Sequence, residues 1–468
     1  MPELYSSNDK SDSHHTSERK AHSEITVRPN IRKYKHFDLP LTTKREWVFD
    51  FSIEKNKHRF YPLIGFDITH RRFDLDPKTN RKKQRQKLRP IRFASHSDAL
   101  YLQAYAEYLH RYYEHFIKVN NLSESILAYR KCIGNNIHHA RDLFSEISQK
   151  KDCSFLAIDI RSFFDKIDHK ILYSEIKNLL KIDRLEKHDY TVWRNITKYS
   201  YVEKKDIIDK LKAEYKKLDP KITQKQIKDR ITKNKRICTK SEFISLVRGR
   251  NNNMIKINEN SHGIPQGTPI SGLYANIYLK SFDLSMLEYC NKIGGSYRRY
   301  SDDIALVFPV CVPKEDVSSK IEELLEMVRL SIAKNKTETA TFQEGRLQKD
   351  SPRPFIQYLG FTFDGDRILI RASTQHAYLR KMRRGIHAKM IAFKHNPKKT
   401  ISEKKEPFKR EVLSRYTHLG KRRNFLRYAH KASKIMESPD IKKQFKRHMT
   451  WFKRSWRKEI KKVLNIST

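Results

Sequence analysis

The chain of 468 residues has few cysteines and no long hydrophobic run. Its five cysteines are scattered, odd in number and form no C-x-x-C pair, which argues against a disulfide framework or structural zinc and fits a reducing compartment. No apolar run approaches the length of a membrane span, and the first ten residues lack the apolar segment of a signal peptide. These absences predict a soluble, cytoplasmic protein with no membrane partner.

Acidic residues are also in short supply, with 54 Asp and Glu against 98 Lys and Arg and a formal net charge of +44. An excess this large repels itself and is best explained by a polyanionic partner, nucleic acid before membrane. Aromatic residues make up 11% of the chain, which indicates a folded core and not a disordered basic protein. The length predicts two to four packed units.

Two adjacent aspartates stand out in the segment 297–308. Asp302 and Asp303 lie between a basic and aromatic lead and the apolar run Ile304–Phe308, a pattern that predicts a β-hairpin with its acids at the turn. Two neighbouring negative charges are unfavourable unless a cation neutralises them. For an Asp-Asp pair alone, a solvated acidic turn is the more common explanation, so the rest of the chain has to decide.

A third acid follows a short apolar strand. Phe155–Ile158 has the nearly continuous apolar character of a strand buried on both faces, and it ends in Asp159. A strand holds such a carboxylate rigidly while its oxygens reach a cleft, as a metal ligand requires. Asp165 and Asp168 fall in the first turns of the helix that follows and are expected only to favour its dipole.

Further candidate residues lie in loops around these acids. Gly263, Gly267 and Gly272 punctuate a loop that contains Gln266, and they permit close approach of a ligand to the backbone. In the predicted strand Leu88–Phe93, Arg89 and Arg92 lie on opposite faces, so at most one points into a given site.

Two other segments have a pattern without a clear function. The tyrosine-rich segment Asp98–Phe116 has helical spacing and is expected to be core more than a base-stacking surface. The lysine-rich residues 204–235 are expected to form an exposed helical insertion, for which a nucleic-acid contact and a solvated face are equally compatible.

The order of these motifs along the chain resembles that of a reverse transcriptase. The motifs are the basic strand, the strand ending in Asp159, the Pro-Gln-Gly loop, the Tyr300–Asp303 turn, Asn335–Thr337 and Tyr358–Phe361. The resemblance covers about residues 85–370 and is to the bacterial group of intron, retron and defence-associated enzymes. It implies an α+β right-hand polymerase with fingers, an antiparallel-sheet palm and a helical basic thumb. The expected units are a disordered polar tail (1–32), an N-terminal and fingers region (33–150), a palm (151–370) with a basic helical insertion near 176–257, and a thumb (371–468).

The resemblance also implies roles for individual residues. Asp159, Asp302 and Asp303 would hold two Mg²⁺ ions, and Lys336 would donate a proton to the leaving pyrophosphate. Arg89, with Lys87, would contact the triphosphate of the incoming nucleotide and Gln266 the nucleotide itself, while Phe164 would exclude a ribose 2′-hydroxyl. The Tyr358–Phe361 hairpin would grip the primer. Three carboxylates without a His or Cys cage suit Mg²⁺, and two such metals suit phosphoryl transfer.

Several details favour the antiphage, defence-associated lineage, including the smaller enzyme of its two-polymerase type. These details are Arg89–His96, Arg371–Met382, Ser301 in place of the usual alanine, and the lack of a C-x-x-C or HNH-like segment after residue 370. The implied function is RNA-directed DNA synthesis with a non-coding RNA, in antiviral defence. The implied partners are RNA template, DNA product and dNTPs, with a second copy or a second reverse transcriptase as the protein partners considered. The alternatives are template-independent or protein-primed DNA synthesis, and an RNA-binding maturase-like scaffold.

Overall fold

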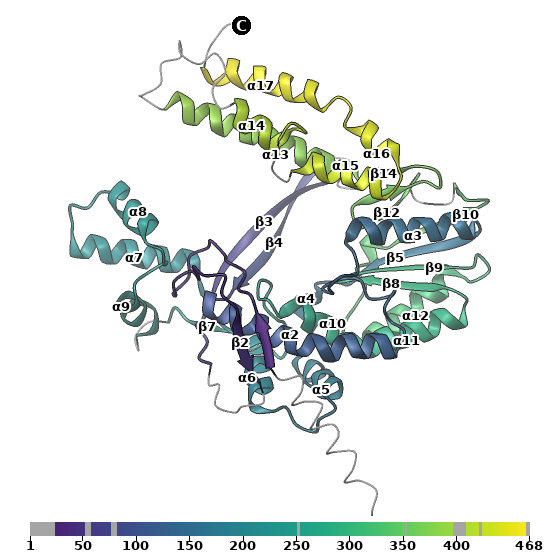
Figure 1. Cartoon of the computed structure of the whole chain (residues 1–468), viewed down its shortest axis with the longest axis horizontal. Helices are drawn as coiled ribbons and strands as arrows, with labels where there is room; N and C mark the ends of the chain where they lie inside the picture. Colours follow the sequence, from purple (N-terminus) through teal and green to yellow (C-terminus); the bar gives the residue numbers. More distant parts are fainter. Residues whose placement is uncertain are drawn as a thin grey trace, which may run out of the picture.

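The computed structural model describes residues 24–51, 58–75, 82–249, 253–349, 351, 353–395, 409–420 and 424–464. Within these residues the chain forms a five-stranded central sheet, a four-stranded sheet built on a long hairpin, two smaller sheets and a C-terminal helical bundle (Figure 1). No helix in the described part of the chain combines the length and apolar character that a membrane span needs.

The central sheet has the strand order β11-β10-β5-β9-β8, and its neighbouring strands are antiparallel. Its strands are β5 (Cys153–Asp159), β8 (Ser296–Tyr300), β9 (Asp303–Phe308), β10 (Glu338–Gln343) and β11 (Arg346–Leu347). The predicted acid-bearing hairpin is therefore present as β8 and β9. The predicted buried strand is present as β5, which lies between β9 and β10.

Alternate residues of β5 and β9 pack into two different cores. Phe155 and Val307 belong to a cluster with α3 (Asn136–Lys150), whereas Leu156 and Leu306 belong to a cluster with α10 (Ser271–Tyr278), α11 (Lys280–Lys292) and α12 (Lys314–Met327). In Figure 1 these helices lie on the two sides of the sheet. Both faces are covered, which explains why these strands are almost continuously apolar.

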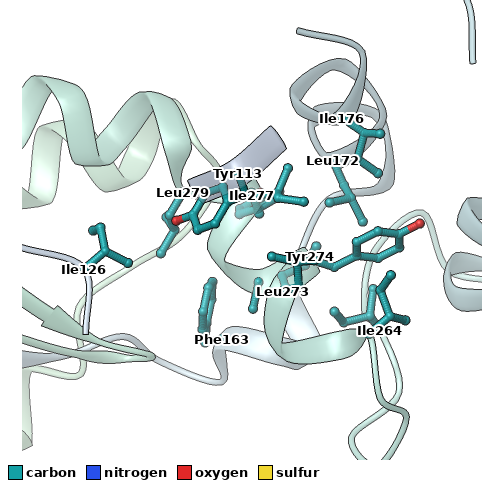
Figure 2. Close-up of a cluster of buried hydrophobic side chains, with 14 of the residues drawn as sticks. Tyr113, Ile126, Phe163, Leu172, Ile176, Ile264, Leu273, Tyr274, Ile277 and Leu279 are labelled. Atoms are coloured by element: carbon teal, nitrogen blue, oxygen red, sulfur yellow. The ribbon is translucent and has the colours of Figure 1, made fainter. Parts of the chain in front are cut away.

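The second sheet has the order β4-β3-β6-β7. Its long hairpin consists of β3 (Leu63–Leu75) and β4 (Lys82–Phe93), and the chain then enters α2 (His96–Val119). The tyrosines of α2 are core residues as predicted, with Tyr101, Tyr105, Tyr108 and Tyr113 buried. Figure 2 shows Tyr113 and Tyr274 among the apolar side chains that join α2 and α10 to α5 (His169–Leu180).

The lysine-rich segment differs from the expected exposed insertion. After α6 (Lys187–Thr197), β6 (Ser200–Glu203) pairs in parallel with β3, and β7 (Lys256–Ile257) pairs with β6. Between them lie α7 (Lys204–Leu218), α8 (Gln224–Lys233), α9 (Lys240–Glu242) and η1 (Phe243–Arg248). Ile207, Leu211 and Tyr215 of α7 are buried in one cluster with Ile64 of β3. The lysines lie on the surface of a packed unit. The high lysine content of the segment made its few buried apolar residues difficult to recognise from sequence.

The N-terminal prediction also needs a correction. Residues 1–23 of the predicted tail lie outside the described residues, but β1 (Glu24–Val27) pairs with β2 (Trp47–Asp50). Ile25 and Val27 are buried against the core that contains α2. A four-residue alternation is too short to distinguish from loop by pattern, and the pairing with β2 makes it a strand.

The remaining elements form the C-terminal part. A three-stranded sheet consists of β12 (Ile356–Tyr358), β13 (Phe361–Phe363) and β14 (Ile368–Ile370). The predicted Tyr358–Phe361 hairpin is present, with its turn at Leu359 and Gly360, both with positive φ. The bundle that follows is helical as predicted. Its helices are α13 (Ala372–Lys394), α14 (Lys409–Tyr416), α15 (Phe425–Ile435), α16 (Pro439–Gln444) and α17 (His448–Leu464).

A buried ion pair anchors the strand that leads into the acidic turn. The Arg299 guanidinium is fully buried and donates to both carboxylate oxygens of Asp283 at 2.7 and 2.6 Å. It also donates to the Asn276 side-chain oxygen at 3.1 Å and to the Ser301 carbonyl at 3.2 Å. One side chain thus connects β8, α10, α11 and the turn.

We predict that Asp283→Ala lowers the free energy of unfolding by about 3–5 kcal/mol, because it leaves the Arg299 charge buried and unpaired. The matched control is Glu323→Ala, which breaks the exposed Lys320–Glu323 pair and should cost at most about 1 kcal/mol. Urea unfolding measures both values. Equal small losses would show that Arg299 is not held by Asp283.

Candidate active site

Three carboxylates meet at one end of the central sheet. Asp159 is the last residue of β5 and lies opposite Asp303, the first residue of β9, in the antiparallel register. Asp302 precedes Asp303 in the turn, and its carbonyl accepts a hydrogen bond from the Ile160 N–H at 3.0 Å. Since β5 and β9 are neighbouring strands, Asp159 shares one sheet edge with Asp302, which lies 143 positions further along the chain, and with Asp303.

The carboxylates repel one another in this position. Loss of water around Asp302 raises its pKa, and the charge of Asp159 raises it further. The pKa of Asp303 rises to about 7, first because neighbouring protein displaces water and then because of the charges of Asp302 and Asp159. The positive charges of Lys336 and Arg371 act in the opposite direction. Such mutual repulsion is what a bound cation relieves.

Lys336 forms an ion pair with one of the three acids. It ends the short helix η2 (Lys334–Lys336), and its Nζ donates to Oδ1 of Asp159 in an ion pair. The same segment is fixed by the Ala333 N–H, which donates to the Asp159 carbonyl at 2.8 Å. In the described structure Lys336 therefore neutralises part of the acidic cluster.

The glycine-containing loop joins the acidic region to β4. The Gln266 carbonyl accepts a hydrogen bond from the Arg92 N–H at 2.9 Å. Gly267 has a φ of +134°, and a Cβ there would lie 2.8 Å from the Arg92 carbonyl oxygen, so this approach requires glycine. The Gln266 side chain is close enough to the Asp165 carboxylate to lower its pKa, against the stronger effect of burial. Gln266 is thus held between the hairpin and the segment after β5.

The two arginines of β4 behave as strand alternation predicts. Arg92 is buried and donates to Glu203 at 2.8 Å, so it holds β6 to the hairpin. Arg89 and Lys87 are exposed, and their spacing of two residues places them on one face of the strand. Lys87 is close enough to Asp165 to lower its pKa, against the stronger effect of burial, which raises it. The exposed pair is therefore on the side of the Gln266 loop.

Phe164 follows Asp159 in the chain, and its backbone contacts this loop. It belongs to the short helix α4 (Phe163–Lys166), is half-buried, and its carbonyl accepts the Ile264 N–H at 2.9 Å. Phe163, its neighbour, is buried and contacts it edge-on with ring centroids 5.6 Å apart. Asp168, expected only to favour the helix dipole, is the N-cap of α5 and accepts from the Lys170 and Ile171 N–H groups.

The three aspartates have the donor chemistry of a Mg²⁺ site, since carboxylate oxygens without competing His or Cys ligands suit this ion. A separate group, Glu186, His188 and Asp189, has its ligand atoms within 4.8 Å of one another at the start of α6. Asp189 is fully buried there and accepts the Tyr105 hydroxyl at 2.8 Å. We assign that group to the packing of α2 against α6.

Several residues near the acids could not be found from sequence spacing. Asn276 and Asp283 hold Arg299, and Arg371 at the start of α13 lies near Asp303. Tyr129, between α2 and α3, hydrogen-bonds Ser301 across 172 positions of sequence. The sequence carried one signal for this last contact, the serine in place of alanine in the turn.

Comparison with known proteins identifies the family. Residues 80–363, more than half of the chain, match the family described as reverse transcriptase (RNA-dependent DNA polymerase). The chain belongs to the reverse transcriptase family. The predicted α+β polymerase fold is thereby confirmed, with the antiparallel central sheet as the palm, and the assignment of the fingers and the thumb remains a prediction. The predicted boundaries between these units remain predictions.

Solved polymerases resemble this reverse transcriptase only distantly. Telomerase from Candida albicans, in complex with a telomeric RNA fragment, has a TM-score of 0.38 and 10% identity, with 99% of this chain and 77% of that chain covered. Truncated telomerase from Candida tropicalis has a TM-score of 0.35 and 10% identity, and an insertion-loop deletion mutant of the RNA-dependent RNA polymerase of a human picobirnavirus has a TM-score of 0.36 and 9% identity. The chain covers 63% of the truncated telomerase and 60% of the viral enzyme, for 74% and 78% of its own length. A comparison with curated proteins gives no match.

The raised pKa of Asp303 gives a testable pH dependence in this reverse transcriptase. A carboxyl whose folded pKa lies above its unfolded value destabilises the fold increasingly as the pH rises from the unfolded to the folded pKa. Asp303→Asn should therefore raise the melting temperature of the metal-free protein at pH 8, and less so at pH 5. Differential scanning calorimetry in EDTA measures this, with Asp316→Asn on α12 as the control. A lower melting temperature at pH 8 would contradict it.

Proposed function

We propose that the protein is an RNA-directed DNA polymerase that uses two Mg²⁺ ions. The observation that carries the proposal is the meeting of Asp159, Asp302 and Asp303 at the palm edge, in a chain of the reverse transcriptase family. A fold kept only as a scaffold has no physical need for three carboxylates that raise one another's pKa. The retained acids therefore support catalysis over a maturase-like scaffold.

The site residues can divide the work of nucleotide addition among them. Asp159, Asp302 and Asp303 would hold the metals, which neutralise the attacking and leaving oxygens when bound. Arg89 and Lys87, exposed on one face of β4, would contact the triphosphate. Gln266, held by Arg92 and Asp165, would orient the nucleotide.

In this scheme Lys336 would interact first with the Asp159 carboxylate and then with the departing pyrophosphate. It pairs with Asp159 in the described structure, and the metals would replace it as counter-charges of that carboxylate. Its ammonium would then be free to give a proton to the departing pyrophosphate. The two roles are consistent because both require a cation at the same edge of the palm sheet.

The biological setting is part of the proposal. We infer that the enzyme copies a non-coding RNA in bacterial antiphage defence, from the resemblance carried by Arg89–His96, Arg371–Met382 and Ser301. The net charge of +44 supports a nucleic-acid partner. The exposed arginines and lysines of α13 and α17 would add to the binding of the RNA and DNA backbones; among them are Arg380, Arg383, Arg384, Lys453, Arg457 and Lys461.

The decisive experiment is to purify the protein from cells and sequence both the RNA and the DNA bound to it. One abundant RNA with complementary DNA supports templated synthesis and identifies the template. DNA without matching RNA would replace the proposal with template-independent synthesis, and RNA without DNA from cells challenged with phage would support the scaffold. Loss of phage protection in the Asp302→Asn strain tests the defence role.

We predict that Asp302→Asn reduces DNA synthesis by at least about 1,000-fold, because the amide keeps the shape of the side chain and removes the charge that holds the metal. RNA binding should change less than about twofold, since the phosphate contacts remain. Primer extension and filter binding measure the two effects, with Asp316→Asn as the control. Undiminished synthesis would remove Asp302 from the site.

We predict that Phe164→Ala admits ribonucleotides, because it removes the ring that would contact a 2′-hydroxyl. The ratio of kcat/KM for dNTP over rNTP should fall at least about tenfold, the effect of a lost apolar contact of one to three kcal/mol. Single-nucleotide incorporation measures the ratio. Phe164→Tyr, which keeps the ring, should retain most of the discrimination, and an unchanged ratio in Phe164→Ala would exclude Phe164 as the gate.

A further inference from the structure

The catalytic turn carries a hydroxyl whose contacts have no part in the scheme above. Ser301 occupies the turn between β8 and β9 with a φ of +62°, and only 5% of it is exposed. Its Oγ lies 3.0 Å from the Tyr129 hydroxyl, and the Ser301 side chain is close enough to the Asp302 carboxylate to lower the pKa of that group. A serine hydroxyl has one proton and can accept while it donates. If Ser301 donates to Asp302, it accepts from Tyr129, and the three groups form one chain.

Tyr129 itself is held in an uncommon backbone conformation. Its φ is +59°, a region that non-glycine residues visit rarely and that persists only where the surroundings enforce it. Its ring packs on the backbone of Gly272 in the first turn of α10, where a Cβ would lie 2.6 Å from the ring. Nearly half of the residue is exposed, yet the hydroxyl points inward to Ser301.

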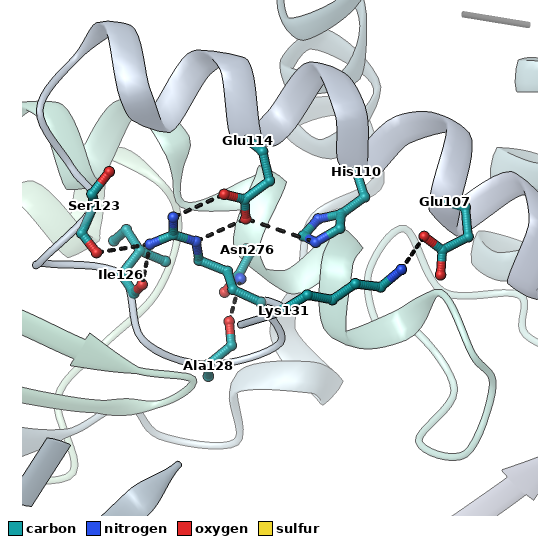
Figure 3. A network of polar contacts seen from close by, with 9 residues as sticks. Glu107, His110, Glu114, Ser123, Ile126, Ala128, Lys131 and Asn276 are labelled. Carbon is teal, nitrogen blue, oxygen red and sulfur yellow. Dashed lines mark hydrogen bonds and ion pairs between the residues drawn. The ribbon is translucent and has the colours of Figure 1, made fainter. Parts of the chain in front are cut away.

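A polar network on both sides of Tyr129 enforces this conformation. Figure 3 shows the Ala128 carbonyl, which accepts from the Asn276 side chain at 2.9 Å. Arg130 donates to both carboxylate oxygens of Glu114 at 2.8 Å and to the carbonyls of Ser123 and Ile126. The residues before and after Tyr129 are thus tied to α10 and α2.

The same loop is joined to the catalytic hairpin through its backbone. The Arg299 N–H donates to the Ser125 carbonyl at 2.7 Å, and the Leu127 N–H donates to the Arg299 carbonyl at 2.9 Å. Asn276 takes part in both halves, since it donates to Ala128 and accepts from Arg299. The Tyr129 hydroxyl is therefore fixed relative to the turn that it contacts.

We propose that Tyr129 is a positioning residue for metal binding, which through the Ser301 hydroxyl fixes the orientation of the Asp302 carboxylate. The inference rests on the proposed two-metal function. Groups that hydrogen-bond a metal ligand orient it, and their loss typically lowers metal affinity or activity by 10–100-fold. Alanine in place of Ser301 would leave Asp302 without this contact, so Tyr129 and Ser301 act only as a pair.

The test compares Tyr129→Phe, Ser301→Ala and the double variant of the full chain, each of which removes only hydroxyl groups. Mn²⁺ alone, titrated by electron paramagnetic resonance, probes the site without nucleic acid. Each single variant should bind Mn²⁺ about tenfold more weakly, and the double variant should be no weaker than the weaker single one. Tyr215→Phe, which loses the hydrogen bond of 2.9 Å to Glu242 in the fingers, should bind as the wild type does.

Primer extension adds a second readout. The half-saturating Mg²⁺ concentration should rise in both single variants, while kcat at saturating Mg²⁺ recovers most of its wild-type value; a merely unstable protein would instead lose kcat. Wild-type Mn²⁺ affinity in Tyr129→Phe would overturn the inference, and so would additive losses in the double variant. If the wild type binds Mn²⁺ and Asp302→Asn does not, but no template supports DNA synthesis, the proposed function fails and the Mn²⁺ titrations still decide the role of Tyr129.

Discussion

The buried pair between Arg299 and Asp283 is the interaction on which the catalytic turn depends. A guanidinium without water is tolerated only if nearly all its donors are matched, and Arg299 meets this condition with Asp283, Asn276 and the Ser301 carbonyl. These partners come from α11, α10 and the turn itself. The ion pair therefore fixes how the hairpin lies against the helices beneath the palm sheet, and through the hairpin it fixes the acids.

The three carboxylates at the edge of the palm sheet repel one another, and this repulsion destabilises the folded protein locally. Asp302 and Asp303 have raised pKa values because neighbouring protein displaces water and because the negative charges of the nearby carboxylates act on them. Lys336 offsets part of the repulsion through its pair with Asp159. When no metal ion is bound, the repulsion between the carboxylates lowers the stability of the site. Bound metal ions relieve this repulsion, which adds to their affinity.

The lysine-rich segment after β6 shows how charge can conceal a core. The chain from α7 to η1 is dominated by lysine, yet Ile207, Leu211 and Tyr215 face Ile64 across a small apolar interior. β6 adds to β3 in parallel, and Arg92 bonds Glu203 at that junction. The segment from α7 to η1 is thus joined to the β3–β4 hairpin, whose strand β4 carries Arg89 and Lys87. The lysines of this segment remain on the surface, where they would be accessible to an RNA or DNA backbone.

Local pattern alone determined the elements that carry the acids. The apolar run before Asp159, the run after Asp303 and the tyrosine spacing of α2 each follow from burial within a few residues, so strand, hairpin and helix could be predicted, and the order of motifs could be recognised as that of a reverse transcriptase. The tertiary structure alone decided which distant surfaces meet: Tyr129 with Ser301, Arg299 with Asp283, β6 with β3, and β1 with β2. Such contacts depend on the packing of whole elements, and neither spacing nor composition encodes them, because a hydroxyl or a short strand has many partners of equal chemistry until the fold selects one.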